Sequence, residues 1–143
     1  MFSLDSRLAQ DTVVIGDFPL SRLLLSNDCN YPWFILVPRI EDISEVFQLS
    51  DKDQLQLWQE TTALSASLKS AFVADKLNVA ALGNVVSQLH MHVIVRYRDD
   101  AAWPAPVWGK HPAKPYTAEQ LSRLLDKFKS ALPVGLVLAQ VAS

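Results

Sequence analysis

The sequence predicts an α+β domain in which an antiparallel sheet of about five strands carries two helices. Three observations predict this class: short β-branched runs joined by turns in the first third, two long segments with helical periodicity, and two more apolar runs between those segments. The chain has 143 residues, half of them hydrophobic, which is enough for one core and too few for two ordinary domains. We therefore expect residues 1–143 to form a single domain.

The first three strands are predicted at residues 12–18, 20–25 and 33–37. These runs are rich in β-branched and aromatic residues, and the first and third stop at a proline. The polar stretch 26–30 between the second and third runs has the Asn and Asp content of a turn. Short connections of this kind favour an antiparallel meander.

Two helices are predicted from capping residues and apolar stripes. Ser50 is a candidate N-cap, and the segment after it places one stripe at alternating steps of four and three: Leu57, Thr61, Leu64, Leu68 and Phe72. Thr117 and Gln120 have capping-box spacing, and Pro133 is expected to stop the second helix. Its apolar face is Leu121, Leu124, Leu125, Phe128 and Leu132. Since each helix has one apolar face, both should lie on the sheet.

Two further strands are expected between the helices, at residues 77–82 and 89–95, separated by the turn-forming pair Gly83-Asn84. The tract 103–109 contains two prolines and two tryptophans. Prolines exclude a central strand or a helix interior, so we expect an ordered aromatic loop there.

Charge and cysteine content exclude several classes of protein. Thirteen Lys and Arg against fifteen Asp and Glu give a net charge of −2, which provides no general basic field for a nucleic acid polymer or an anionic membrane. The single cysteine, Cys29, cannot form an intrachain disulfide, which fits a reducing compartment. The N-terminus has an early acid and no basic start, and no apolar run approaches about 20 residues. We expect a cytoplasmic protein.

Two of the three histidines lie in one predicted strand, residues 88–95. Side chains alternate along a strand, so Gln88, His90 and His92 are predicted to share one face. One interpretation is a solvated polar face. A second is a metal site, because imidazoles at i and i+2 can reach one ion, although His111 is the only other histidine.

A third interpretation is nucleophilic catalysis at phosphorus. A neutral imidazole is a good nucleophile near pH 7, and a second imidazole beside it can assist the leaving group. Such a site needs hydrogen-bond donors for phosphate oxygens, and the turn Gly83-Asn84-Val85-Val86-Ser87 just upstream supplies backbone N–H groups, an amide and a hydroxyl.

These residues resemble the signature of the histidine triad (HIT) superfamily, whose motif alternates three histidines with apolar residues and has a glycine five residues before the first. The matching run is Asn78, then Gly83-Asn84-Val85-Val86-Ser87, then Gln88-Leu89-His90-Met91-His92-Val93-Ile94-Val95. Val37-Pro38-Arg39 also resembles the end of a strand in the family. The resemblance covers residues 10 to 109 and implies a HIT-like fold, usually as a homodimer.

The resemblance also implies roles for individual residues. His90 would attack the α-phosphate of a nucleotide and become transiently nucleotidylated, and His92 would hydrogen-bond the phosphate or leaving-group region. The expected substrate-binding residues are Asn27, Asp28, Asn78, Gly83, Asn84, Val85 and Ser87. Asn27 or Asp28 would hold a ribose, although both residues are also ordinary turn formers. Trp33, Trp103 and Trp108 are candidates for covering a base, for packing a dimer or for ordinary core.

Gln88 departs from the motif, because it stands where the family has its first histidine. An amide can donate and accept hydrogen bonds, but it carries no proton between pH 5 and 8. With His90, His92 and Gln88 as the catalytic set, we expect a hydrolase or nucleotidyl transferase for dinucleoside polyphosphates or nucleoside phosphoramidates, with no metal and no cofactor. The alternative is a non-enzymatic nucleotide-binding or metal-binding protein that uses the same pocket.

Overall fold

Six strands form one antiparallel sheet in the computed structural model, which describes residues 1–140. The strand order is β4-β5-β3-β2-β1-β6. The strands are β1 (Thr12–Asp17), β2 (Ser21–Ser26), β3 (Trp33–Pro38), β4 (Lys76–Ala80), β5 (Met91–Arg96) and β6 (Val137–Leu138). The predicted α+β class and the antiparallel meander of the first three strands are confirmed.

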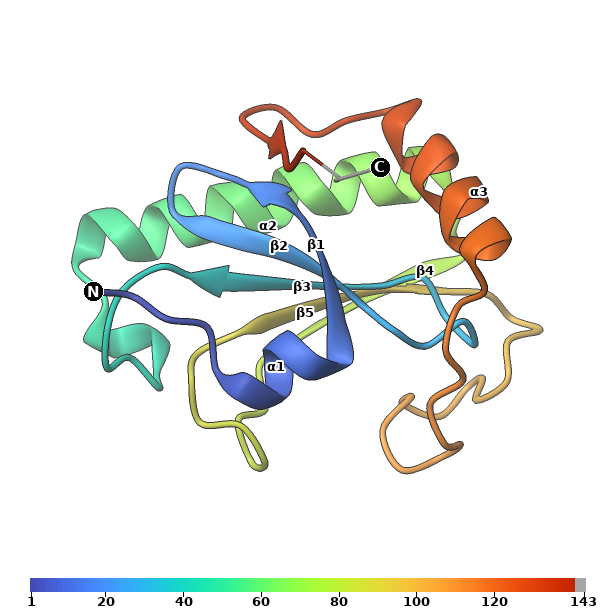
Figure 1. The fold of residues 1–143 in the computed structure, drawn as a ribbon, viewed down its shortest axis with the longest axis horizontal. Coiled ribbons are helices and arrows are strands. Elements are labelled where there is room, and N and C mark those ends of the chain that lie inside the picture. The colour runs from blue at the N-terminus through green and yellow to red at the C-terminus, as the bar shows by residue number, and fades with distance from the viewer. Residues whose placement is uncertain (141–143) are drawn as a thin grey trace.

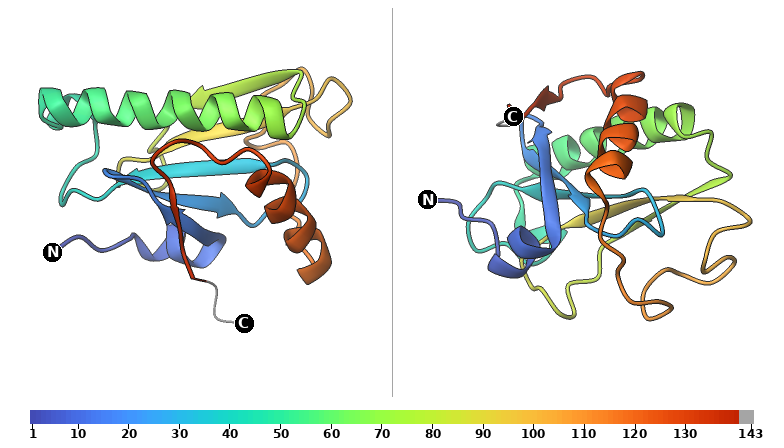
Figure 2. Two further views of the ribbon diagram at one scale, coloured as in Figure 1. Left: turned by 90° about the horizontal axis from the view of Figure 1, so that it is seen from above. Right: turned by 45° about the vertical axis from the view of Figure 1, so that its right-hand side comes forward.

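Three α-helices lie on the two faces of this sheet: α1 (Ser6–Asp11), α2 (Asp51–Ala71) and α3 (Ala118–Lys129), with a short 3₁₀ helix at Val46–Gln48. In Figure 1, α2 and α3 lie above the strands and α1 lies below them. Figure 2 shows α2 running alongside β4 and β5. Within residues 1–140, no helix has both the length and the apolar character needed to cross a lipid bilayer.

The two long helices begin where their capping residues predict. Ser50 Oγ accepts a hydrogen bond from Asp53 N at 3.1 Å. Thr117 and Gln120 form the complete capping box. The predicted end of α3 is wrong, because the helix stops at Lys129 and leaves Leu132 exposed beyond it. A helix needs no proline to end when its last turn no longer has apolar contacts.

The helix face of the sheet is the face covered by α2 and α3. The helices contribute Leu64, Leu68, Phe72, Leu124 and Phe128 to its core, and the strands contribute Ile15, Leu23, Leu25, Phe34, Leu36, Val93 and Val95. All of these side chains are buried. The periodic stripes of the sequence therefore define this face.

The site face is the opposite face, where Leu8 of α1 packs against Leu24, Ile35 and Val37. Here the cover is mostly irregular: in Figure 1, α1, the loop 81–90 and the loop 101–116 all lie below the sheet. Because side chains alternate along β5, Val93 points to the helix face and His92 points to the site face.

Two elements are absent from the sequence-based prediction. Helix α1 is one and a half turns long and begins at Asp5, whose carboxylate accepts from two backbone N–H groups. Strand β6 has two residues and pairs with Gly16 and Asp17 of β1. A Cβ at Gly16 would lie 2.3 Å from the carbonyl oxygen of Val137, so only glycine allows this approach. Elements this short contain too few residues to show a periodic pattern in the sequence.

The predicted strand 89–95 is wrong at its start, because β5 begins at Met91. Residues 81–90 form an irregular loop, and Leu89 N donates to the carbonyl of Ile43 rather than to a neighbouring strand. The preceding strand likewise ends at Ala80 rather than at residue 82. Gln88 and His90 therefore lie on the loop that enters β5, and only His92 lies within the strand.

Candidate active site

His90 and His92 lie side by side at the start of β5. Their ring centroids are 4.8 Å apart and their planes are inclined at 69°. Both side chains are buried, with 7% and 5% of their surface exposed. Although His90 precedes the strand, the structure brings the two imidazoles together.

The hydrogen bond made by His90 fixes which of its nitrogens carries the proton. Its Nδ1 lies 2.7 Å from the backbone carbonyl oxygen of Gln88. A carbonyl oxygen only accepts, so Nδ1 must donate. In the neutral ring, Nε2 then keeps its lone pair. His90 has the protonation pattern of a nucleophile or base at Nε2.

His92 has the opposite tautomer. Trp33 Nε1 lies 2.9 Å from His92 Nδ1, and an indole N–H only donates, so Nδ1 accepts and the proton of the neutral ring is on Nε2. Burial, with a smaller contribution from His90, lowers the pKa of His92 from 6.5 to about 3. At neutral pH His92 is therefore an uncharged hydrogen-bond donor.

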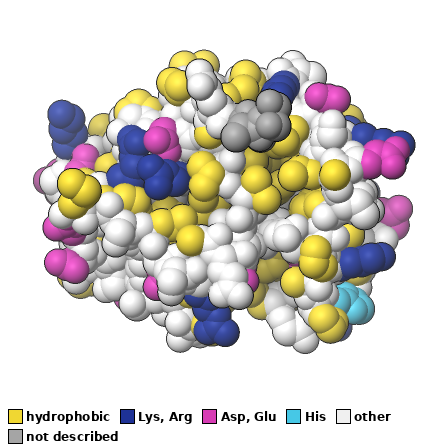
Figure 3. Space-filling model, in the orientation of Figure 1, with side chains coloured by type: hydrophobic (Ala, Val, Ile, Leu, Met, Phe, Trp, Pro, Cys, Tyr) yellow, Lys and Arg dark blue, Asp and Glu magenta, His cyan; other side chains and the backbone are white. Residues whose placement is uncertain are grey.

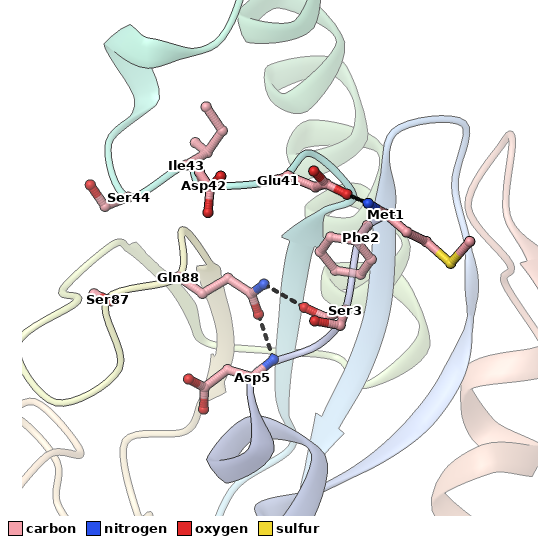
Figure 4. Close-up of a pocket in the computed structure, with 10 residues that line it drawn as sticks. All are labelled: Met1, Phe2, Ser3, Asp5, Glu41, Asp42, Ile43, Ser44, Ser87 and Gln88. Atoms are coloured by element: carbon pink, nitrogen blue, oxygen red, sulfur yellow. Dashed lines mark hydrogen bonds and ion pairs between the residues drawn. The ribbon is translucent and has the colours of Figure 1, made fainter.

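The Gln88 side chain is hydrogen-bonded to the N-terminal segment (Figure 4). Its Oε1 accepts from Asp5 N at 2.8 Å and its Nε2 donates to the carbonyl of Ser3 at 2.9 Å. The prediction that Gln88 shares a strand face with both histidines is wrong, since the strand begins after it. Its contact with His90 is made by its backbone carbonyl, which any residue would supply.

A cleft of about 610 Å³ opens between the N-terminal segment, residues 41–44 and the end of the loop 81–90 (Figure 4). Its lining includes three acids, Asp5, Glu41 and Asp42, together with the predicted site residues Ser87 and Gln88. The α-amino group of Met1 pairs with Glu41. This cleft is therefore acidic.

A second cleft, of about 390 Å³, lies between the end of α1, the end of β2, the start of β3 and the loop 107–115. Trp33 and Trp108 line it, and the Trp108 ring is 5.0 Å from His92 between centroids. The volume is in the range of small-molecule sites. This cleft adjoins the histidine pair.

Asn27 and Asp28 line the second cleft and also hold the loop that forms its far wall. Asn27 Oδ1 accepts from Tyr116 N at 3.0 Å. Asp28 Oδ1 accepts from Asn30 N at 3.0 Å and from Lys114 N at 3.3 Å. Asn27 and Asp28 therefore stabilise turns of the chain, as expected for turn-forming residues, and both also line the cleft.

Asn78 lies at neither cleft. Its Oδ1 accepts from Nη1 of the buried Arg96 at 2.7 Å, and Arg96 forms a two-pronged ion pair with Asp100 at 2.8 and 3.0 Å. Burial raises the pKa of Asp100, but hydrogen bonds from Arg96 and three backbone N–H groups outweigh it and lower the pKa to about 2. This cluster orders the start of the loop that carries Trp108.

The predicted phosphate-binding residues lie on the loop 81–90. Gly83 has a φ of +77°, a conformation that favours glycine, and Asn84, Val85 and Ser87 are exposed. They precede His90 on the same loop. Within residues 1–140, no group of three His, Cys, Asp or Glu side chains is arranged to hold a metal ion.

Sequence reasoning found the histidine pair but not the partner of His92. Trp33 was expected to cover a base, to pack a dimer or to fill core, and its hydrogen bond to His92 gives it a different task. The sequence gives little sign of this contact, because Trp33 lies 59 residues before His92 in the chain and only the pairing of β3 with β5 brings them together.

Comparison with known proteins agrees with this geometry. Residues 7–99 match the HIT domain family. Histidine triad proteins from Marinobacter aquaeolei and Sinorhizobium meliloti are 50% and 45% identical, each with a TM-score of 0.89 over 92% of this chain and 96% and 98% of theirs. One from Bradyrhizobium japonicum is 45% identical, with a TM-score of 0.88 over 91% of this chain and 97% of that one. Among curated proteins, none matches.

The fold and the paired histidines define a histidine triad type of domain. The chain belongs to the HIT domain family.

Proposed function

We propose that this protein is a nucleotide hydrolase or nucleotidyl transferase that acts at the α-phosphate of dinucleoside polyphosphates or nucleoside phosphoramidates. One observation carries the proposal: the Gln88 carbonyl holds the proton of His90 on Nδ1 and leaves Nε2 free as a nucleophile. Membership of the HIT family, whose members are generally nucleotide-binding proteins or hydrolases, supports it.

In the first step, the lone pair of His90 Nε2 forms a bond to the α-phosphorus while the bond from phosphorus to the leaving group breaks. The leaving group departs with that electron pair, and an amine leaving group takes its proton from solvent. The positive charge on the phosphorylated imidazole is stabilised through Nδ1–H by the Gln88 carbonyl. His92 donates from Nε2 to a non-bridging oxygen and stays neutral throughout.

In the second step, water or another acceptor forms a bond to the same phosphorus, and the bond to His90 Nε2 breaks. The electron pair returns to Nε2, so the ring regains the Nδ1–H tautomer that the Gln88 carbonyl holds. The acceptor's proton passes to solvent. For water the sum is one nucleotide and one leaving group: the released proton replaces the one that an amine leaving group took up, or stays in solvent when the leaving group is a polyphosphate.

We propose that Gln88 occupies the first triad position and that its amide supports the site indirectly. Both of its side-chain hydrogen bonds go to the N-terminal segment, so the first position acts here as an anchor rather than as a proton carrier. The catalytic pair in this proposal is His90 and His92.

The second cleft is the proposed nucleoside site. Trp33 and Trp108 offer aromatic surface for a base, and Asn27 and Asp28 offer amide and carboxylate groups for ribose hydroxyls. The loop residues Gly83, Asn84, Val85 and Ser87 are the proposed phosphate contacts, and all but the half-buried Gly83 are exposed. On the face seen in Figure 3, basic side chains are scattered among acidic ones, so local donors rather than a basic field would hold the phosphate.

We further propose a homodimer. Strand β4 is at one edge of the sheet and exposes Val79, and Leu82 and Val85 are exposed on the loop after it. An apolar, unpaired strand edge favours pairing with a second copy. Sedimentation at micromolar concentration should give twice the chain mass, and a monomer would contradict the proposal.

Covalent labelling tests the proposed reaction. The protein is incubated with a dinucleoside polyphosphate or a nucleoside phosphoramidate carrying ³²P at the α-position and then quenched in alkali, in which a phosphohistidine bond survives. Label retained on the wild-type protein and absent from His90→Asn supports the nucleotidyl-histidine intermediate. A protein that binds the nucleotide but takes up no label and forms no product is a binding protein, and the proposal is then wrong.

A further inference from the structure

The indole of Trp33 makes the one hydrogen bond that the structure gives to the His92 ring within residues 1–140. The donor is Nε1 of Trp33, at the first residue of β3, and the acceptor is Nδ1 of His92, 2.9 Å away. The two ring centroids are 5.7 Å apart and the planes are tilted by 58°. Trp33 is therefore placed to determine the protonation state of His92.

Neighbouring aromatic rings hold the indole in this orientation. Tyr31 packs against Trp33 edge-on at 6.4 Å between centroids, and Trp108 packs against it edge-on at 5.5 Å. Tyr31 is itself buried, so its ring is fixed by the core. A side chain wedged between two such rings keeps one rotamer, and the direction of its N–H is set before any ligand enters.

Among residues 1–140, no charged side chain is hydrogen-bonded to Nδ1 of His92 in competition with the indole. β3 and β4 place Ile35 and Ala80 in register with His92, and neither side chain titrates. The loop 101–116 contributes Trp108, and the titratable neighbour is His90. Asp28 and His111 line the adjoining cleft.

We propose that Trp33 is a positioning residue: its N–H holds the proton of neutral His92 on Nε2, so that His92 always presents a donor to the phosphate. This rests on the proposed function for its role in turnover. Without the indole N–H, either nitrogen of a neutral imidazole can carry the proton. A fraction of molecules would then present a lone pair to an anionic phosphate, which weakens binding of the transition state.

The hydrogen bond also opposes protonation of His92. An N–H that donates to the neutral ring stabilises the neutral form, and its loss raises the pKa of that ring. In the folded protein the pKa is already low because His92 is buried. Replacing the indole N–H should therefore raise the pKa of the His92 ring, by about one unit for the loss of one hydrogen bond.

The cleanest variant replaces Trp33 with 3-benzothienylalanine, which keeps the bicyclic shape and substitutes sulfur for the N–H. Trp33→Phe is a second, genetically simple variant. Trp108→Phe is the matched control, because Trp108 also packs against the His92 ring, at 5.0 Å between centroids, with no hydrogen bond to it in the described residues. The control separates loss of aromatic packing from loss of the donor.

The deciding measurement is a ¹⁵N–¹H NMR spectrum of the histidine rings in the protein without substrate. Wild type and Trp108→Phe should show the Nε2–H tautomer at His92, and the benzothienyl variant should show a mixture. With substrate, the benzothienyl variant should lose about tenfold in kcat with little change in KM, and without substrate its His92 ring signals should titrate at a higher pH than those of wild type.

A benzothienyl variant whose His92 ring keeps the Nε2–H tautomer would overturn the proposal for Trp33. Because the spectrum needs no turnover, it judges the role of Trp33 even if the protein proves to be a binder. Absence of labelling and turnover in wild type, with the expected change of tautomer in the variant, would overturn the proposed function alone.

Discussion

The two faces of the sheet are built in different ways. On the helix face, two regular elements bury a continuous set of apolar side chains. On the site face, a short helix and two irregular loops are fastened at single points, such as Gln88 to Ser3 and Asp5, and Arg96 to Asp100. The helix face is stabilised by one large apolar core, and the site face by smaller apolar clusters together with directed hydrogen bonds and the Arg96–Asp100 ion pair.

The two faces therefore contribute differently to the stability of the fold and to the chemistry of the site. A truncation in the packed core should lower the free energy of unfolding of the whole domain, whereas loss of a hydrogen bond that holds a loop should first loosen that loop. A directed bond can also fix a proton or a ring orientation, which apolar contact cannot do. Substitutions on the two faces should therefore affect different measurements.

The largest effect is expected for His90→Asn, which removes the proposed nucleophile and should lower turnover by about ten-thousandfold, while nucleotide binding and the melting temperature change little. Turnover is measured with a saturating phosphoramidate or dinucleoside polyphosphate. Gln59→Asn, at an exposed position of α2 away from both clefts, is the control and should stay within about twofold of wild type. Turnover by His90→Asn close to wild type would contradict the proposed mechanism.

Next in size is Asp100→Asn, which leaves the buried Arg96 without its counter-charge and should cost about 3–5 kcal/mol in the free energy of unfolding. The folded-state pKa of Asp100 is about 2, below its ordinary 3.8, so the pair stabilises fully above about pH 4 and less as the pH falls towards 2. Urea unfolding of wild type and of Asp100→Asn at pH 7 and at pH 3 measures both the cost of the substitution and its dependence on pH. Asp99→Asn, at an exposed position, should lower the free energy of unfolding by less than about 0.5 kcal/mol. A loss as large as that of Asp100→Asn would contradict a specific role for Asp100.

On the helix face, Leu68→Ala should lower the free energy of unfolding by about 2–5 kcal/mol, because the side chain is fully buried. The turnover of the molecules that remain folded should be unchanged, since Leu68 lies on the face opposite the histidines. Thermal melts and assays well below the melting temperature check the two parts. Leu55→Ala, on an exposed position of the same helix, provides the comparison and should be nearly neutral.

The smallest effect is expected for Gln88→Leu. It removes two hydrogen bonds to the N-terminal segment, worth about 1–3 kcal/mol together, and keeps the backbone carbonyl that orients His90. Amide hydrogen exchange at residues 5–8 should accelerate, while turnover stays within about tenfold. A loss of turnover comparable to His90→Asn would show that the Gln88 amide does act in catalysis. Gln59→Leu, exposed on α2, should change neither measurement.

The sequence predicted the helix face well because that face is periodic. Leu57, Thr61, Leu64 and Leu68 repeat at helical spacing, and every one of them is buried. The pair His90 and His92 could also be identified, because their spacing of two is local. Local patterns of this kind are visible in a single chain.

The remaining features of the site depend on residues that are distant in the chain. Gln88 meets Asp5 across a separation of 83 residues, and Asn27 meets Tyr116 across 89. No spacing rule relates such positions, so the anchoring of the N-terminal segment and the loop wall of the second cleft were not predicted. Trp33 illustrates the same limit, because its residue type suggested packing whereas its partner gives it a role in fixing a proton.

The close approach of β6 to Gly16 has a consequence for assembly. Two-residue β6 covers the Gly16–Asp17 end of the β1 edge, and a larger side chain at position 16 would displace it. The backbone of β1 that is paired with β6 is not free to pair with a strand of another molecule. Growth into a fibre needs two open edges, so Gly16, by admitting β6, shortens one of the two edges through which this sheet could grow.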